Sequence, residues 1–152
     1  MVTTQPVNIR IRVTILVQRP DGRVCLVRHL KDGRRYWLLP GGGQEPFECM
    51  TETARRELWE ETRIACGQFE FLGLRESFAS EAGRHIVYPV FRGLNPDFSA
   101  VERGEDARVE AVDFLTWEEI RERTVFPEMK TDLERLVRGE PILPFLTLDW
   151  IP

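Results

Sequence analysis

The sequence predicts an α/β fold in which strands and helices follow one another along one chain. Several short stretches carry an apolar residue at every second position, which is the period of a strand with one buried face. Other stretches repeat apolar residues every three or four positions, as an amphipathic helix does. With 152 residues and 42% apolar content, the chain is long enough for a core and too short to suggest two domains. We therefore expect residues 1–152 to form a single domain.

Strands are expected in both halves of the chain. Apolar residues alternate with polar ones from Ile9 to Val17, and a Pro-Asp-Gly turn then leads into a returning strand. A further short strand is stopped by Pro40 and the glycine run that follows it. Pro89, inside a later strand, indicates an edge position or a bulge. The predicted strands are residues 9–17, 24–28, 36–39, 69–77, 84–92 and 109–115.

Three helices are expected. The first has Met50, Ala54 and Leu58 at i, i+4 and i+8, which gives it an apolar face. The second opens with the capping-box pattern Thr-Trp-Glu-Glu, and the third has a proline near its start and a glycine just past its end. The predicted helices are residues 47–62, 117–123 and 127–138.

The last segment, residues 141–152, reads PILPFLTLDWIP and is too apolar to be a free linker. Such a surface is normally covered by another part of the protein. We expect the segment to pack either on the domain itself or on a second subunit, which makes a homodimer one possible assembly.

Charge and cysteine content exclude several functional classes. The chain has 21 Lys plus Arg against 25 Asp plus Glu, a net charge of −4, which disfavours nonspecific binding of duplex nucleic acid. The three cysteines form no Cys-x-x-Cys pair, so we expect neither a zinc site nor a disulfide framework, but small buried or half-buried residues. The N-terminal region carries charges within its apolar stretch and resembles neither a signal peptide nor a membrane span. A soluble cytoplasmic protein is expected.

The densest chemical signal is the sequence RELWEE, which places Glu57, Glu60 and Glu61 at i, i+3 and i+4. On a helix these carboxylates share one stripe, where like charges repel by about 0.2 to 0.5 kcal/mol per pair. A divalent cation such as Mg²⁺ would remove this repulsion, because it prefers carboxylate oxygens. The alternative is a solvated face on which Glu52, Arg56 and Glu60 form a ladder of ion pairs.

A glycine loop at a fixed distance before these carboxylates completes a known motif. The pattern Gly-x5-Glu-x7-Arg-Glu-apolar-x-Glu-Glu-x-Gly-apolar is typical of the Nudix hydrolase (MutT-like) family, and residues 42–64 resemble it at eight of its nine specified positions. The matching residues are Gly42, Glu48, Arg56, Glu57, Leu58, Glu60, Glu61 and Ile64. The sequences YWLLP before the glycines and FLTWEEI later in the chain also resemble this family.

The resemblance implies a Nudix-type α/β/α sandwich around a mixed β-sheet that binds Mg²⁺ or Mn²⁺. It further implies hydrolysis of the diphosphate in a nucleoside diphosphate linked to another group. Oxidised nucleoside triphosphates, ADP-ribose, nucleotide sugars and dinucleoside polyphosphates all contain this linkage. Because a diphosphate is strongly anionic and reacts slowly with water, metal ions are suited to neutralise its charge and to activate a bound water.

The same resemblance implies a role for each residue of the motif. The metal ligands would be the carboxylates of Glu57, Glu60 and Glu61 together with the carbonyl oxygen of Gly41. Arg56 would orient these catalytic glutamates. Glu48 would help to hold the loop to the helix.

Two positions depart from the family pattern. Arg63 stands where the motif has glycine, so a left-handed helix end there would cost roughly 1 kcal/mol or more. Phe47 stands where family loops often have a glycine, and its ring is expected either to narrow the loop or to pack on a substrate base.

Residues outside the motif allow both functional and structural interpretations. Acidic residues before the last strand either supply a further ligand or base or are solvated loop residues: Glu105, Asp106 and Glu110. Basic residues of the middle strands either reach phosphates or lie at the surface: Arg75, Arg84 and His85. Two aromatic residues either stack on a base or pack in the core: Trp37 and Tyr88.

We therefore expect a metal-dependent Nudix pyrophosphohydrolase acting on a small nucleotide derivative. A noncatalytic Nudix-like module that binds a nucleotide and regulates another process is the alternative. The presence of all three carboxylates disfavours it, because binding alone does not require them. A purely structural domain with an acidic surface is the third interpretation.

Overall fold

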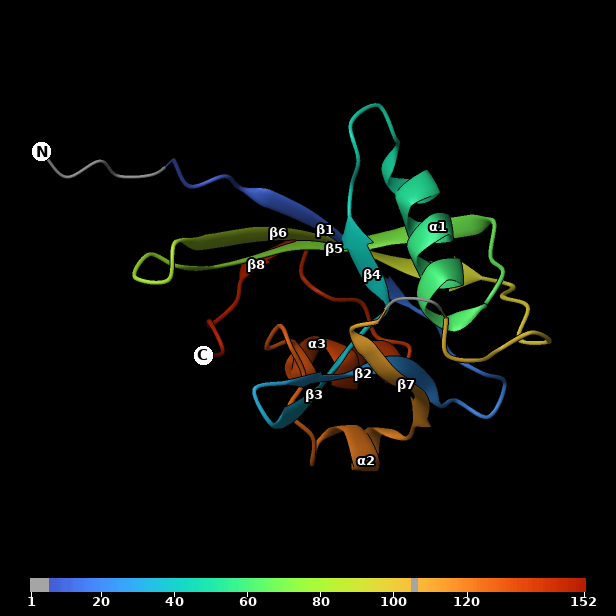
Figure 1. Ribbon diagram of the computed structural model, residues 1–152. Helices are drawn as coiled ribbons and strands as arrows, with labels where there is room; N and C mark the ends of the chain where they lie inside the picture. The colour runs from blue at the N-terminus through green and yellow to red at the C-terminus, as the bar shows by residue number, and fades with distance from the viewer. Residues whose placement is uncertain (1–5, 105–106) are drawn as a thin grey trace, which may run out of the picture.

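The computed structural model describes residues 6–104 and 107–152 and has a mixed α/β fold, as expected (Figure 1). Its strands are β1 (Arg10–Leu16), β2 (Val24–Lys31), β3 (Arg34–Leu38), β4 (Gly41–Gly43), β5 (Gln68–Ala79), β6 (Arg84–Leu94), β7 (Val109–Leu115) and β8 (Phe145–Thr147). Its helices are α1 (Met50–Thr62), α2 (Trp117–Ile120) and α3 (Lys130–Val137).

The larger sheet is mixed, with strand order β4-β1-β6-β5-β8. Strand β1 pairs antiparallel with β4 and parallel with β6, while β5 pairs antiparallel with β6 and parallel with β8. The second sheet is antiparallel, with order β3-β2-β7. The described residues therefore form two sheets, one of five strands and one of three.

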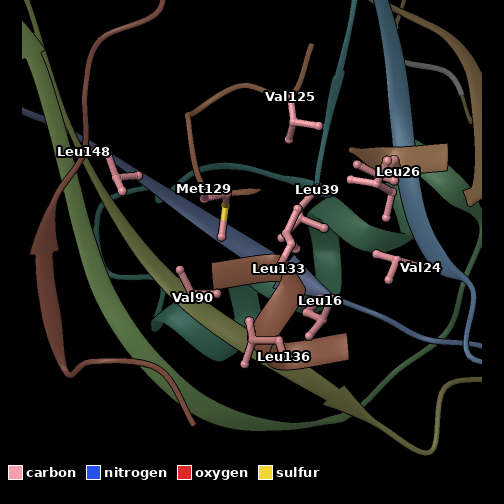
Figure 2. Close-up of a cluster of buried hydrophobic side chains, with 11 residues drawn as sticks. Leu16, Val24, Leu26, Leu39, Val90, Val125, Met129, Leu133, Leu136 and Leu148 are labelled. Carbon is pink, nitrogen blue, oxygen red and sulfur yellow. The ribbon is translucent and has the colours of Figure 1, made fainter. Parts of the chain in front are cut away.

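Helix α1 and helix α3 cover opposite faces of the larger sheet (Figure 1). Successive side chains of a strand point to opposite faces, and β1 shows this directly. Val13 and Ile15 pack with the α1 residues Ala54 and Leu58, whereas Leu16 packs in a separate cluster. That second cluster joins the larger sheet to α3 and to β2 (Figure 2), and its labelled members are Leu16, Val24, Leu26, Leu39, Val90, Val125, Met129, Leu133, Leu136 and Leu148. The expected layered arrangement is confirmed, with a second sheet added to one layer.

Helix α1 is bounded by local capping. At its start, Glu52 Oε2 accepts a hydrogen bond of 3.0 Å from the Cys49 backbone N–H. At its end, Arg63 adopts a left-handed conformation with φ of 57°, and its N–H donates to the Trp59 carbonyl. The helix begins three residues later than predicted because Phe47 also has a positive φ, of 65°, which is incompatible with a right-handed helix.

Two strands are absent from the sequence prediction. Strand β4 consists only of glycines, so no side-chain alternation marks it, yet it pairs with β1 in the register Val13↔Gly42. Strand β8 adds the segment 141–152 to the edge of the larger sheet, and Leu148 beyond it is buried. Of the two interpretations of this segment, the structure shows packing on the domain.

Two other expectations need correction. Pro89 lies in β6, which has β1 and β5 on either side, so the predicted edge position is wrong. The irregular pairing lies in β5, between Phe71 and Gly73, next to Leu74, the partner of Pro89. Cys25 and Cys66 are buried as expected, but Cys49 is exposed because it caps α1. Within the described chain, no helix is long and apolar enough to cross a membrane.

Candidate active site

The glycine loop lies directly against the acidic face of α1. A Cβ atom on Gly42 would overlap the Glu57 carboxylate, and one on Gly41 would overlap the Val13 carbonyl. Only glycine allows the backbone to approach this closely. Gly42 is therefore a steric requirement of the contact between β4 and α1, and Gly41 is one of the contact between β4 and β1, whereas a Cβ on Gly43 would meet no neighbour.

Arg56 joins the loop to two carboxylates of the helix. Its guanidinium donates to both oxygens of Glu48 at 2.8 and 2.9 Å, and to Glu57 Oε1 at 2.8 Å. It also donates to Glu60 Oε2 at 3.4 Å and to the Gly43 carbonyl at 3.2 Å. Five contacts from one planar group fix the position of the loop relative to the helix.

Glu48 is ionised and held in place by this pairing. The hydrogen bonds from Arg56, followed by one of 2.6 Å from the Thr53 hydroxyl, lower the pKa of Glu48 to about 2. The same pairing raises the pKa of Arg56 above its ordinary value. The structure thus connects Glu48 to the helix in the way the family resemblance implies.

The three carboxylates of the motif lie in different environments. Glu57 is 9% exposed and Glu61 is 2% exposed, whereas Glu60 is exposed to solvent. Burial raises the pKa of Glu57, and the hydrogen bond from Arg56 opposes that shift. Glu61 Oε1 accepts a hydrogen bond of 2.7 Å from the Gly41 N–H. Two buried carboxylates on one helix, both against the glycine loop, form the centre of the candidate site.

The carboxylates do not converge on one point in this structure. Among the described residues, no group of three or more His, Cys, Asp or Glu side chains is arranged to hold a metal ion. Glu57 and Glu60 turn toward Arg56, while Glu61 turns toward Gly41. Glu57 and Glu60 thus share one cationic side chain, whereas Glu61 accepts from a neutral backbone N–H.

The donor set nevertheless fits a hard divalent cation. It offers two buried carboxylates, a third at the surface, and loop carbonyls brought close by a glycine contact that a Cβ would fill. Oxygen donors of this kind are what Mg²⁺ and Mn²⁺ prefer.

Arg12 is a component of the site that the sequence interpretation missed. Its Nη2 donates to the carbonyls of Leu39 and Gly41 at 3.2 and 3.3 Å, and its Nη1 donates to the Thr14 hydroxyl at 3.3 Å. The Gly41 carbonyl, expected as a metal ligand, is thus held by a guanidinium. Arg12 reaches the loop because it pairs with Gly43 across β1 and β4. The sequence did not indicate this pairing, because the strand β4 was not predicted.

His29 was also missed. Its Nε2 lies 4.0 Å from Glu61 Oε2, and its side chain is largely buried. It comes from β2, in the smaller sheet, so its approach to α1 depends on how the two sheets pack. Nothing in its sequence neighbourhood distinguishes it from an ordinary strand residue.

The other acidic candidates lie elsewhere or outside the described residues. Glu110 accepts two hydrogen bonds of 3.0 Å from Arg35 and pairs with Arg28, which lowers its pKa. It therefore serves a surface ion-pair cluster. Glu105 and Asp106 fall outside the described part of the chain.

The basic and aromatic candidates have structural partners. Arg75, expected at the surface or on a phosphate, is fully buried and pairs with Asp132 at 2.7 and 3.0 Å. His85 pairs with Glu76 at 3.2 Å. Tyr88 is buried in the core. Of the two side chains that depart from the family pattern, Phe47 is fully exposed and Arg63 stacks on Trp59.

Comparison with known proteins shows the family to which this chain belongs. The model of the NUDIX domain family matches residues 8–136, and the chain belongs to that family. It is accordingly a Nudix pyrophosphohydrolase. Members of the family generally use divalent metal ions and act on small nucleotide substrates.

Two curated relatives illustrate the similarity. A MutT-like protein of Streptomyces ambofaciens is 36% identical over 120 residues, which cover 79% of this chain and 72% of that protein. The phosphatase NudJ of Escherichia coli K12 is 32% identical over 65 residues, which cover 43% of this chain and 42% of NudJ. The second match therefore spans less than half of either protein.

Solved structures support the fold. A MutT protein from Bacillus halodurans superposes with a TM-score of 0.75 at 20% identity, covering 94% of this chain and 91% of that one. A MutT protein from Methanosarcina mazei Go1 gives 0.73 at 23% identity, covering 90% and 98%.

Proposed function

We propose that the protein is a Mg²⁺- or Mn²⁺-dependent hydrolase that cleaves the diphosphate linkage of a nucleoside diphosphate joined to another group. The observation that carries the proposal is the burial of Glu57 and Glu61 against the glycine loop. Burying two carboxylates side by side is unfavourable unless a cation compensates for it.

Glu57, Glu60 and Glu61, with the Gly41 carbonyl, would hold the metal ion. When bound, the ion supplies charge neutralisation at the diphosphate and lowers the pKa of a bound water. Arg56 positions the carboxylates of Glu57 and Glu60 through its hydrogen bonds. Glu48 in turn fixes Arg56.

We further propose that residues 1–152 form one domain that acts on a small molecule in the cytoplasm. A homodimer is an assembly to be tested, because Leu143 before β8 and Phe145 and Leu146 within it remain exposed. Light scattering distinguishes the dimer from a monomer.

A noncatalytic nucleotide-binding module is the second candidate. The contact between Arg12 and the Gly41 carbonyl favours it, because a guanidinium stands at a position expected to bind metal. The two candidates differ in one respect that can be measured, which is turnover.

A hydrolysis screen tests the proposal. Oxidised nucleoside triphosphates, ADP-ribose, nucleotide sugars and dinucleoside polyphosphates are incubated with Mg²⁺ or Mn²⁺, and products are identified by mass. On a confirmed substrate, Glu57→Gln and Glu61→Gln should each lower kcat by at least about 100-fold, as expected for the loss of a catalytic group. The exposed Glu118 provides the control, and Glu118→Gln should leave kcat unchanged. Turnover close to that of the wild type in both site variants would refute the assignment.

A further inference from the structure

Four aromatic rings lead away from the buried Glu61 carboxylate. His29, 4.0 Å from Glu61, lies 5.5 Å from the ring of Tyr36. Tyr36 lies 6.4 Å from Phe126, and Phe126 lies 5.7 Å from Trp150, measured between ring centroids. We call these four side chains the aromatic run. It begins at the candidate active site and ends in the segment 141–152.

The fold assembles this run from four separate parts of the sequence. His29 and Tyr36 are cross-strand partners on β2 and β3. Phe126 lies beside β3 because Trp37 N–H donates to the Thr124 carbonyl and Phe126 N–H donates to the Trp37 carbonyl, both at 2.9 Å.

Trp150 is brought to the run by the anchoring of its own segment. The Leu148 N–H donates to the Glu76 carbonyl at 2.7 Å, and the Leu148 side chain is buried. After β8, the segment leaves the larger sheet and runs toward the side of the molecule that holds β3 and α3 (Figure 1). Trp150 lies beyond residues 8–136, the part of the chain that matches the family.

The rings of Tyr36, Phe126 and Trp150 are half-buried, and the His29 side chain is 12% exposed. Residues that only fill a core are usually buried completely, as Tyr88 is in this protein. A half-buried aromatic side chain keeps part of its ring surface available for a flat ligand. The run therefore combines fixed positions with accessible ring surface.

We propose that the aromatic run binds the aromatic base of the substrate, with Trp150 as its outermost, specificity-determining residue. The inference rests on the proposed function, because it places the diphosphate at Glu57 and Glu61 and the base further along the run. Stacking on aromatic side chains tolerates different bases, since every base has a π-face. The substrate class is thus a nucleotide derivative with an aromatic base, in preference to a diphosphate that lacks one.

The opposing explanation is that Phe126 and Trp150 only attach the segment 141–152 to the domain. In that case, removing the Trp150 ring would weaken the binding of every diphosphate equally, or of none. A base-stacking role weakens only the binding of ligands that carry a base.

Calorimetry with two nonhydrolysable probes separates these explanations. In the presence of Mg²⁺, α,β-methylene-ADP carries a base and methylenediphosphonate does not. Trp150→Ala should weaken the binding of α,β-methylene-ADP about 10-fold, within the range for the loss of one stacked base, and that of methylenediphosphonate less than 2-fold. Phe145→Ala is the matched control, because Phe145 is an exposed aromatic residue of the same segment, and it should change neither affinity.

Equal effects of Trp150→Ala on both probes, or no effect on either, would overturn the inference. So would a wild-type protein that binds α,β-methylene-ADP no more tightly than methylenediphosphonate. If Trp150→Ala fails to fold, NMR of the wild-type protein provides a second test. The indole signal of Trp150 is assigned as the one that Trp150→Phe removes. It should shift with α,β-methylene-ADP and not with methylenediphosphonate; the same shift with both probes, or with neither, contradicts the inference.

The hydrolysis screen keeps this inference distinct from the proposed function. Hydrolysis by the wild type together with unchanged probe affinities in Trp150→Ala would reject the role of the aromatic run alone. Failure to hydrolyse any screened compound, with base-dependent binding intact, would reject the hydrolase alone.

Discussion

At the scale of single residues, Arg56 and Glu48 determine how the loop meets the helix. Arg56 contacts Glu48, Glu57, Glu60 and the Gly43 carbonyl at once. A lysine could not replace it, because a single ammonium cannot make two parallel hydrogen bonds to a carboxylate. The pair therefore orders both the acidic residues and the backbone opposite them.

The lowered pKa of Glu48 predicts a specific pH dependence of stability. Its pKa falls from 4.5 to about 2 on folding, so its contribution is present above pH 4.5 and is lost as the pH falls toward 2. Glu48→Gln should be less stable than the wild type at pH 7, and the difference should shrink across this pH range. Urea unfolding at several pH values measures it, with Glu118→Gln as the control. A difference that is independent of pH would contradict the pairing with Arg56.

Arg12 provides a second prediction for single residues. Its guanidinium holds the Gly41 carbonyl and repels a divalent ion nearby. Arg12→Met should therefore bind Mn²⁺ about 5-fold more tightly, equivalent to roughly 1 kcal/mol of removed repulsion. Arg10→Met, an exposed position on the same strand, is the control and should change the affinity less. Equal or weaker binding by Arg12→Met would show that Arg12 supports the metal site.

At the scale of elements, the sequence predicts strands and helices where side chains carry the signal. Strand β7 has the predicted bounds, and α1 ends at the predicted residue. Strand β4 was missed because its three glycines have no side chains to alternate. Strand β8 was missed because its three residues, which directly follow Pro144, are too few to show an alternating pattern.

The junction of α3 with β5 provides a prediction at this scale. Arg75 and Asp132 form a buried pair between these elements, and Arg75 also donates to the Leu74 carbonyl. Removing one partner of such a pair typically costs 3–5 kcal/mol, whereas replacing both with apolar residues costs little. We expect Arg75→Met to lower the free energy of unfolding by about 3 kcal/mol, and Arg75→Met with Asp132→Leu to recover most of it. Denaturant titration measures both, and a double variant as unstable as the single one would contradict this account.

At the scale of the whole molecule, the site depends on contacts that no local pattern contains. The motif predicted which residues of α1 and its loop come together, because their spacing lies within one loop and one helix. It did not predict His29 or Arg12, which reach the same place from other strands. Nor did it predict the aromatic run, whose members come together only when both sheets and the last segment have packed. Contacts within the loop and helix could therefore be predicted from sequence, whereas contacts that depend on tertiary packing could not.

The central claim is that Glu57 and Glu61 belong to a metal site, and Mn²⁺ binding followed by electron paramagnetic resonance tests it most directly. The wild type should bind Mn²⁺ in the presence of α,β-methylene-ADP. Glu57→Gln and Glu61→Gln should each weaken this binding at least about 10-fold, because each removes a charged oxygen ligand, while Glu118→Gln should not. Equal Mn²⁺ affinity in the wild type and both site variants would contradict the account.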